Sequence, residues 1–356
     1  MRLSPLRILG ALAGLLVVTG IVLYLLPSND YLLLPDRAHP VAPLVRVQGG
    51  HTPPGPGGIY FVDVIERRAS VLESECYGTD SFFRRVLHHF VQTQICSPFT
   101  RSGATLVPAN LIVPPGVSDQ AARRVDLREM TISQRVAAAV ALRRLGYHVV
   151  ARPAGVIVDA IELGSHAAGE LEPADVIVSV DGTPTLTIAK LRTVFAHVHP
   201  GADVTLGFRR GTQRLTATVQ TIADPFDKRR AIVGFTPDQA ADIRLPLSVQ
   251  IDSGNVGGPS AGLAFALEVL EKLGRKVDRG YRVAATGQME LDGQVSPIGG
   301  VKQKTLGARE AKADVFLVPA GDNAAEARRY AHGLRIIAVK SFPQALHALA
   351  TLPRKG

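Results

Sequence analysis

The segment Gly257–Gly262 most constrains how this chain can fold, because a run with the apolar spacing of a helix follows it at once. It reads Gly-Gly-Pro-Ser-Ala-Gly, and Gly274 stands just past the predicted end of the helix. From Ala231 onward, strand patterns and helix patterns alternate. This alternation predicts a C-terminal α/β or α+β domain of about 125 residues.

A second glycine-rich segment, Pro297 to Lys304, reads Pro-Ile-Gly-Gly-Val-Lys-Gln-Lys. A serine hydroxyl is a poor nucleophile until a base takes its proton, and a lysine amine can do so only when it is neutral. Burial among apolar side chains favours the neutral amine. The sequence therefore predicts a pair of Ser260 as nucleophile and Lys304 as base. Backbone N–H groups around Gly257, Gly258 and Ala261, at the start of the helix, are predicted to hold an oxyanion.

Several motifs in this region resemble those of the proteolytic domain of Lon proteases. They are Gly258-Pro259-Ser260-Ala261-Gly262, Thr286-Gly287, Gly293-Gln294-Val295 and the segment ending at Lys304. The resemblance covers roughly residues 228 to 354. It implies that Ser260 is the nucleophile, that Lys304 is the general base, and that Lys302 is not catalytic. It also implies that Thr286 hydrogen-bonds near the lysine and helps to orient it.

The chain departs from that pattern at several positions. Gly257 stands where many Lon domains carry an acidic residue, and Gln288 replaces a glutamate. Ser248 and Gln250 stand near the place where histidines are expected. No G-x-x-x-x-G-K-[ST] phosphate loop occurs, so the sequence predicts neither an ATPase domain in this chain nor a cofactor.

Residues 147 to 219 read as short strands with one helix. Gly164 to Leu171 and Ala174 to Gly182 resemble a PDZ domain of the kind associated with bacterial proteases, although Ala174 stands where a glycine is usual. The resemblance implies a groove that takes an extended peptide by strand addition. The loop Pro153-Ala154-Gly155-Val156 is predicted to bind the peptide terminus. The alternative is a β-rich spacer without a ligand.

The run from Ile8 to Leu26 contains no charged residue and would span about 28 Å as a helix. Arg2 and Arg7 precede it, whereas Asp30 and Asp36 follow. This charge bias predicts a signal anchor with a cytoplasmic N-terminus and the remaining chain outside the cytoplasm. A cleaved signal peptide is the alternative, but the run is long and no small-x-small cleavage site follows it.

The predicted fold class is therefore a multidomain α+β protein. Its parts are a transmembrane anchor (residues 1–27), a mixed N-terminal region (28–128), a PDZ-like domain with a preceding helix (129–224) and a Lon-type domain (225–356). Within the mixed region, the patterns favour a single strand over Ile59–Ile65 and a helix over Arg84–Phe90. A further helix is predicted over Ser133–Leu145, at the start of the third part.

Two residue types bear on chemistry in the N-terminal region. Cys76 and Cys96 could form a disulfide in an oxidising compartment or stay as free core thiols. His88 and His89 are adjacent and so do not share a helix face, and no further ligands occur at a recognisable spacing. No metal site is predicted. The net charge of +9 comes from scattered residues without a nucleic-acid motif, so attraction to an anionic membrane surface is favoured over nucleic-acid binding.

Two rival functions remain. The pattern Gly258-x-Ser260-x-Gly262 also fits a nucleophile elbow, whose partners would be Asp314 or Asp322 and His332 or His347. The other rival is a non-catalytic, membrane-tethered PDZ adaptor. Anchor, PDZ-like and Lon-type parts together resemble the ATP-independent, membrane-bound Lon-like proteases of Gram-positive bacteria. That resemblance implies protein or peptide substrates and a homo-oligomer, often a hexameric ring.

Overall fold

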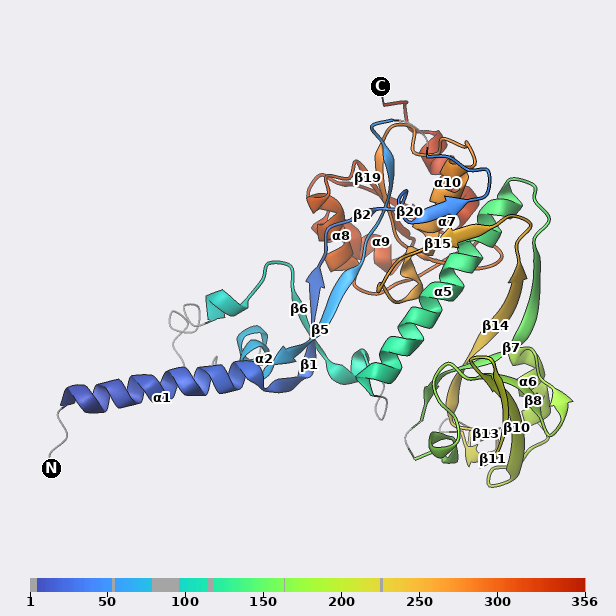
Figure 1. Ribbon diagram of the computed structural model, residues 1–356, viewed down its shortest axis with the longest axis horizontal. Helices are drawn as coiled ribbons and strands as arrows, with labels where there is room; N and C mark the ends of the chain where they lie inside the picture. The colour runs from blue at the N-terminus through green and yellow to red at the C-terminus, as the bar shows by residue number, and fades with distance from the viewer. Residues whose placement is uncertain are drawn as a thin grey trace.

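A computed structural model describes residues 5–52, 55–78, 96–113, 118–162, 164–224 and 227–355. A larger body and a smaller β-rich body are connected by two long strands, β7 (Val150–Ile161) and β14 (Phe235–Arg244), and the long helix α5 (Asp119–Arg144) runs along the larger body (Figure 1). The helix predicted over Ser133–Leu145 is thus confirmed, and it begins about four turns earlier.

The larger body is built around a five-stranded sheet in the order β2-β4-β16-β19-β20. Its strands are β2 (His39–Pro40), β4 (Gly58–Phe61), β16 (Arg282–Ala285), β19 (Val315–Pro319) and β20 (Arg335–Val339). All neighbours are parallel except β2 and β4. Parallel sheets are covered on both faces, which explains why β19 is an unbroken buried run.

Helices cover both faces of this sheet. Those packed on one face are α5, α7 (Gly262–Lys272) and α10 (Phe342–Ala350), and those on the other are α8 (Val301–Glu310) and α9 (Asp322–Tyr330). Every residue of α7 is buried, which accounts for its nearly continuous apolar sequence. Two short strands, β17 (Gln288–Met289) and β18 (Val295–Ser296), form a hairpin between β16 and α8.

The N-terminal region does not form a separate unit, because parts of it complete the larger body. Strand β4 pairs with β16, and Phe61 lies against Phe265 of α7 with ring centroids 6.2 Å apart. Strand β3 (Val45–Val47) pairs with β15 (Val249–Ile251). In the sequence, the β-rich body therefore lies between an N-terminal and a C-terminal segment that together form the core of the larger body. Short strands that pair across a long stretch of sequence carry no local signal of this arrangement.

The single strand predicted over Ile59–Ile65 is two strands, since β4 ends at Phe61 and β5 (Val64–Ser70) begins three residues later. Strand β5 joins a three-stranded sheet with β1 (Pro27–Pro35) and β6 (Thr105–Pro108). Short helical segments complete this part: α2 (Val71–Tyr77), η1 (Ser97–Phe99) and η2 (Ala109–Leu111). Cys76 and Cys96 form a disulfide. The helix predicted over 84–90, with His88 and His89, lies outside the described residues.

The β-rich body contains a sheet in the order β11-β10-β8-β7-β14. Its elements are β7, η3 (His166–Gly169), β8 (Val176–Val180), β9 (Thr183–Pro184), α6 (Ile188–Phe195), β10 (Asp203–Arg210), β11 (Gln213–Gln220), β12 (Ile222–Ala223), β13 (Ala231–Ile232) and β14. Strands β12 and β13 pair, and Val233 and Phe235 join the core of this body. The body therefore continues past the boundary predicted at residue 224.

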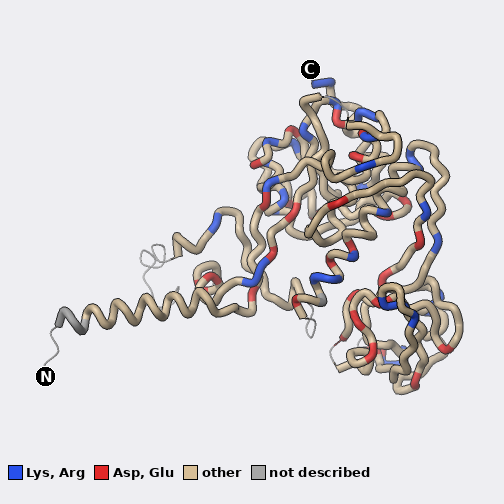
Figure 2. The backbone as a smooth tube through the Cα atoms, in the orientation of Figure 1, with Lys and Arg blue, Asp and Glu red and all other residues tan. Residues whose placement is uncertain are grey.

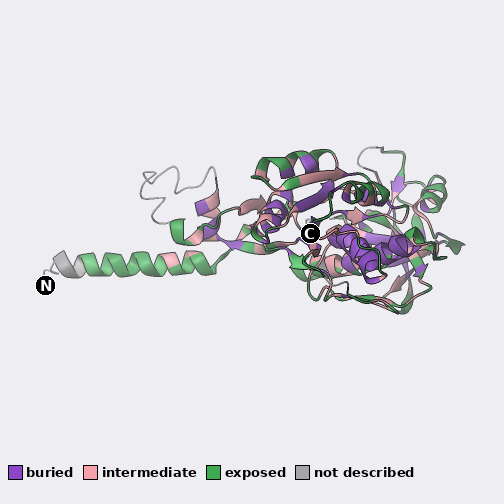
Figure 3. Ribbon diagram, turned by 90° about the horizontal axis from the view of Figure 1, so that it is seen from above, coloured by how far each residue is buried: buried purple, intermediate pink, exposed green. Residues whose placement is uncertain are grey.

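Helix α1 (Pro5–Leu25) extends away from the larger body (Figure 1). Its described side chains are mostly exposed (Figure 3), and it carries no charged residue after its first turn (Figure 2). Within the part of the chain that the structure describes, no helix meets the length and hydropathy of a membrane span. The anchor predicted for residues 1–27 is therefore not supported. Figure 2 also shows acidic and basic residues interspersed over both bodies, which agrees with the scattered distribution of charged residues in the sequence.

Candidate active site

Ser260 lies in a single 3₁₀ turn, Pro259–Ala261, that leads directly into α7. Gly258, just before this turn, has φ of 78°, a backbone conformation that favours glycine. Pro259 has a φ suited to the first helical position and no N–H that would need a partner there. The Gly-Pro-Ser order therefore places the serine at the N-terminal end of α7, where helix N–H groups have no intrahelical partner.

Lys304 lies in the first turns of α8, which begins after Gly300. Gly300 has φ of 67°, and a Cβ built there would stand 2.6 Å from Cγ2 of Val64. The lysine is only 5% exposed, and its Nζ donates a hydrogen bond of 2.8 Å to Oγ of Ser260. The predicted nucleophile and base thus lie within the range needed for proton transfer.

The surroundings of Lys304 favour a neutral amine. Burial lowers the pKa of Lys304 to about 8, against the opposing influence of Glu66 and Asp63. A substantial fraction of the lysine is therefore neutral slightly above physiological pH. A neutral amine can accept the proton of Ser260, which is the requirement for a Ser-Lys pair.

The two carboxyl groups that act on Lys304 come from the N-terminal region. Asp63 lies between β4 and β5, and Glu66 lies within β5. Burial raises the pKa of each carboxyl group, and Asp126 of α5 raises that of Glu66 further. The lysine thus stands in a site with acidic neighbours that limit how far its pKa falls.

Thr286 contacts the serine turn. Its side chain is fully buried, and its hydroxyl donates a hydrogen bond of 3.1 Å to the backbone carbonyl of Ser260. The N–H of Gly287 donates to the same carbonyl at 2.8 Å. The resemblance placed this threonine beside the lysine. In the structure, its hydrogen bond fixes the backbone of the nucleophile.

The predicted oxyanion residues differ in what their N–H groups can do. The N–H of Gly258 donates to the carbonyl of Asp126 at 2.8 Å, so this donor is occupied. Ala261 is buried in the turn that contains Ser260. A Cβ built on Gly257 would stand 2.7 Å from Cβ of Asp126 and 3.1 Å from Nη1 of Arg123. An acidic side chain would therefore not fit at position 257, where the resemblance expects one.

Lys302 contacts a different part of the molecule. Its Nζ donates to the carbonyl of Ala104 at 3.2 Å and to Oγ1 of Thr105 at 3.1 Å. The ammonium also stands 5.8 Å from the ring centroid of Tyr330. Lys302 thus ties α8 to the segment that leads into β6.

Within the described residues, Oγ of Ser260 is hydrogen-bonded to Lys304 and to none of the partners proposed for a nucleophile elbow. Asp314 accepts from the N–H of Arg282, at the amino end of β16, and forms an ion pair with Lys355 at 2.7 Å. Ser260 contacts Thr286, past the carboxyl end of the same strand, roughly 13 Å away along the strand. Of the remaining candidates, Asp322 begins α9, His347 lies in α10, and His332 follows α9.

The four residues predicted to bind a peptide terminus, Pro153 to Val156, lie within strand β7 rather than in an open loop. Strand β14 is hydrogen-bonded antiparallel to β7 along its length, so the chain itself occupies this edge. Gln239 of β14 strengthens the pairing, since its Nε2 donates to the carbonyl of Gly155 at 3.0 Å. A Gly-containing stretch between apolar residues looks like a loop in sequence, whereas here it is the site of a bulge.

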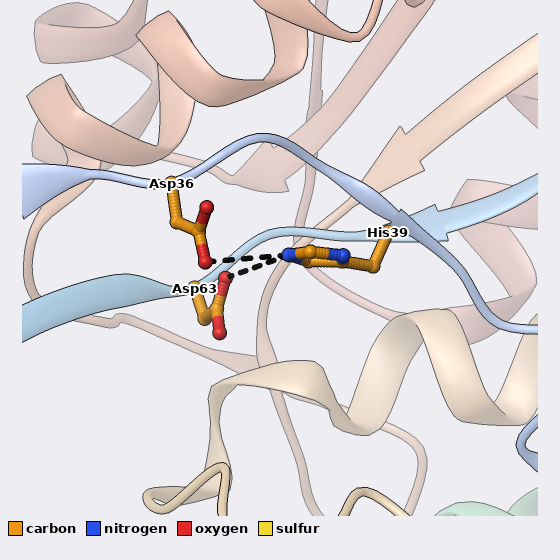
Figure 4. A group of neighbouring side chains, drawn as sticks. All are labelled: Asp36, His39 and Asp63. Atoms are coloured by element: carbon orange, nitrogen blue, oxygen red, sulfur yellow. Dashed lines mark hydrogen bonds and ion pairs between the residues drawn. The ribbon is translucent and has the colours of Figure 1, made fainter.

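A second polar group lies near the lysine. Nε2 of His39 stands 3.3 Å from Oδ2 of Asp36 and 4.0 Å from Oδ1 of Asp63, and both carboxyl groups face this one nitrogen of the ring (Figure 4). Within the described ranges this is the group whose atoms are close enough together to hold a metal ion. The same atoms are already joined to one another by a hydrogen bond and an ion pair.

Comparison with known families separates the chain into two matched regions. Residues 234–350 match the Lon protease (S16) C-terminal proteolytic domain. The chain contains a Lon-type proteolytic domain. Residues 143–221 match the PDZ domain family. Ser260, at the start of α7, and Lys304, in α8, both lie within the residues that match the Lon-type domain.

Curated relatives agree with this assignment. Lon protease 2 of Bacillus subtilis is 34% identical over 122 residues, which are 34% of this chain and 21% of the relative. Lon protease 1 of Sorangium cellulosum is 35% identical over 105 residues, or 27% of this chain and 13% of the relative. The chain thus spans about a fifth or less of the length of these relatives.

Among solved structures, the PDZ domain of the SdrC-like protein of Listeria monocytogenes is similar to part of this chain. The likeness covers 23% of this chain and 86% of that one, at 21% identity and a TM-score of 0.22.

Several residues that shape the Lon-type site lie outside the matched region. Asp63 and Glu66 act on Lys304, and Asp126 contacts the residues that precede Ser260. Sequence reasoning missed them because they lie more than a hundred residues before the serine. The available signal was the run Ile59–Ile65, an apolar strand interrupted by one aspartate and followed by a glutamate.

Proposed function

We propose that this protein is an ATP-independent serine endopeptidase in which Ser260 and Lys304 form the catalytic dyad. The observation that carries the proposal is the 2.8 Å hydrogen bond between Nζ of Lys304 and Oγ of Ser260 in a buried site. The lowered pKa of Lys304, about 8, supports a lysine that can act as base.

The chemistry follows from these two groups. Oγ of Ser260 attacks the carbonyl carbon of the scissile peptide while its proton passes to Nζ of Lys304. N–H groups at the start of α7 stabilise the oxygen anion of the tetrahedral intermediate. Lys304 then gives the proton to the leaving amine, which leaves an acyl group on Ser260. Water, deprotonated by the same lysine, releases this acyl group.

Substrates of this reaction are proposed to be unfolded or selected proteins. The PDZ domain is proposed to aid their recognition, as the resemblance implies. The pairing of β14 with β7 means that a peptide would have to use the outer edge of β14 or displace that strand. Assembly into a homo-oligomer stays a prediction from resemblance.

We propose that the Lon-type domain works outside the cytoplasm. The disulfide between Cys76 and Cys96 supports this location, because disulfides persist in oxidising compartments and are rare in the cytosol. Mass spectrometry of protein alkylated in intact cells before lysis tests it. Free thiols at both positions would argue for a reducing compartment.

Hydrolysis of fluorescent casein, with and without ATP, tests the proposed function. We expect wild-type protein to release fluorescent peptides at the same rate in both conditions and Ser260→Ala to release none. Loss of activity in His332→Ala or His347→Ala would favour the nucleophile elbow. Absence of hydrolysis by the wild type, with no acylation of Ser260 by a fluorophosphonate, would favour the PDZ adaptor.

A further inference from the structure

Two buried hydroxyl groups, one on α5 and one just after β16, hold consecutive backbone carbonyls of the turn Pro259–Ala261. Oγ of Ser133, on α5, donates to the carbonyl of Pro259 at 2.8 Å. Thr286, after β16, donates to the carbonyl of Ser260 at 3.1 Å. Ser133 is 3% exposed and Thr286 is fully buried, so water does not compete strongly for these carbonyls.

Holding a carbonyl also fixes the N–H of the next residue. A trans peptide unit is planar, and its C=O and N–H point in opposite directions. The bond from Ser133 to Pro259 therefore directs the N–H of Ser260 away from α5. The bonds from Thr286 and Gly287 to Ser260 direct the N–H of Ala261 away from the β16 side.

These two N–H groups belong to the start of α7, where donors lack intrahelical acceptors and negative charge is favoured. Donors of this kind are suited to the oxygen that becomes negative when Ser260 attacks a carbonyl. Gly258 cannot contribute in the same way, since its N–H is already bonded to Asp126. The direction of the Ser260 N–H is thus the feature that a hydroxyl on α5 can control.

We propose that Ser133 is a positioning residue that aims the backbone N–H of Ser260 at the oxyanion of the tetrahedral intermediate. This inference rests on the proposed serine peptidase function. It assigns a role in the reaction to a helix that lies outside the residues matched by the Lon-type family. The carbonyl of Pro259 also accepts from the N–H of Gly262, so loss of Ser133 loosens the turn without unfolding it.

A purely structural role is the competing explanation, because Ser133 also lies where α5 and α7 pack closely. A Cβ built on Gly262 would stand 2.8 Å from Oγ of Ser133. A structural role predicts that stability, substrate binding and turnover all change together. A positioning role predicts that turnover changes while substrate binding and stability do not.

The test compares Ser133→Ala with Gln134→Ala. Gln134 is the matched control. It is the next residue on α5, and its Nε2 donates to Oγ of Ser253, seven residues before Ser260, at 2.9 Å rather than to the carbonyl of Pro259. For each protein we would measure kcat and KM on a fluorogenic peptide and the midpoint of thermal unfolding. We would also measure the dissociation constant of a boronic acid built on the same peptide.

The boronic acid reports on the oxyanion directly. Oγ of Ser260 adds to boron, its proton passes to Nζ of Lys304, and boron becomes tetrahedral and negatively charged. We expect Ser133→Ala to lower kcat and to weaken boronate binding by similar factors, about tenfold, with KM within about twofold of wild type. Gln134→Ala should leave kcat and the affinity for the boronic acid close to the wild-type values. If Ser133→Ala does not fold, Ser133→Cys, with its weaker donor, should show the same pattern to a smaller extent.

The outcomes separate this inference from the proposed function. If wild type turns over peptide and Ser133→Ala retains both kcat and boronate affinity, the positioning role is wrong and the peptidase stands. A parallel fall of kcat, 1/KM and unfolding temperature would show that Ser133 is structural. If wild type binds the boronate but cleaves no peptide, a selective loss of boronate affinity in Ser133→Ala supports the positioning role while the proposed function fails. If wild type does not bind the boronate, both proposals fail.

Discussion

A side chain on Gly257 would collide with Asp126, because a Cβ built there would stand 2.7 Å from Cβ of the aspartate. Helix α5 therefore lies directly against the loop that carries Ser260. Burial raises the pKa of the Asp126 carboxyl group, consistent with a position beside the site rather than in open solvent. The sequence has no acidic residue at position 257, but Asp126 of α5 places a carboxyl-bearing residue next to that position.

This contact predicts that Gly257→Ala is destabilising. Overpacking of this kind costs about 1–3 kcal/mol in the free energy of unfolding, and displacement of the loop should also lower kcat. Asp126→Gly removes the opposing Cβ, although glycine within a helix itself costs about 1 kcal/mol. Urea unfolding of both single variants and the double variant measures the coupling. Additive effects would show that the two residues do not collide.

The acidic neighbours of Lys304 predict the direction of a pH shift. The base must be deprotonated, so kcat/KM should rise as pH rises through about 8, the pKa of Lys304. The negative charge of Glu66 holds this pKa up. Glu66→Gln should therefore move the midpoint of the pH profile to lower pH and raise activity at pH 7. Glu170→Gln, an exposed change in the PDZ domain, is the control and should leave the midpoint in place.

The same lysine should limit stability. Its pKa falls from 10.5 to about 8 in the folded protein, so below pH 8 the fold must hold a buried ammonium group. A shift of this size lowers the free energy of unfolding by about 3 kcal/mol. This destabilisation is present in full below pH 8 and disappears as pH rises towards 10.5. We expect Lys304→Met to raise the free energy of unfolding by about 1–3 kcal/mol at pH 7 and to abolish hydrolysis. If wild type and Lys304→Met had equal free energies of unfolding at pH 7 as well as at pH 10, this prediction would be wrong.

Strand β14 predicts how the PDZ domain responds to peptides. Because β14 pairs with β7 along its length, amides of Val150–Ile161 should exchange slowly in the peptide-free protein. Addition of a peptide should not increase their protection. Gln239→Ala removes hydrogen bonds to the carbonyls of Gly155 and Leu186, and should speed exchange in β7. Fast exchange of β7 in the wild type, slowed by a peptide, would show instead that this edge is open.

The sequence predicted local features of the Lon-type domain well. The helix after Gly262 and the alternation of strands and helices from Ala231 onward, predicted from apolar patterns, correspond to α7 and to the series β16, α8, β19, α9, β20 and α10. The pairing of Ser260 with Lys304 followed from a glycine-rich turn and from the resemblance. These features depend on residues close together in the chain, so their pattern contains the information.

Other features depend on contacts across long stretches of sequence, and the patterns did not predict them. The short strand Gly58–Phe61 joins the central sheet through β16, more than two hundred residues away. Ser133 reaches Pro259 from a helix assigned to another domain. Strand β14 was assigned to the Lon-type domain, yet it forms the edge of the PDZ sheet. No local periodicity distinguishes these partners from other apolar segments of similar length.

The comparison of Lys304→Ala with Lys302→Ala tests the central claim most directly. The two lysines lie two residues apart on α8, yet only Lys304 reaches Oγ of Ser260, at 2.8 Å, while Lys302 contacts Ala104 and Thr105. Initial rates on a fluorogenic peptide should fall by at least about a thousandfold in Lys304→Ala and stay within about threefold of wild type in Lys302→Ala. Retained hydrolysis in a folded Lys304→Ala protein would contradict the Ser-Lys dyad.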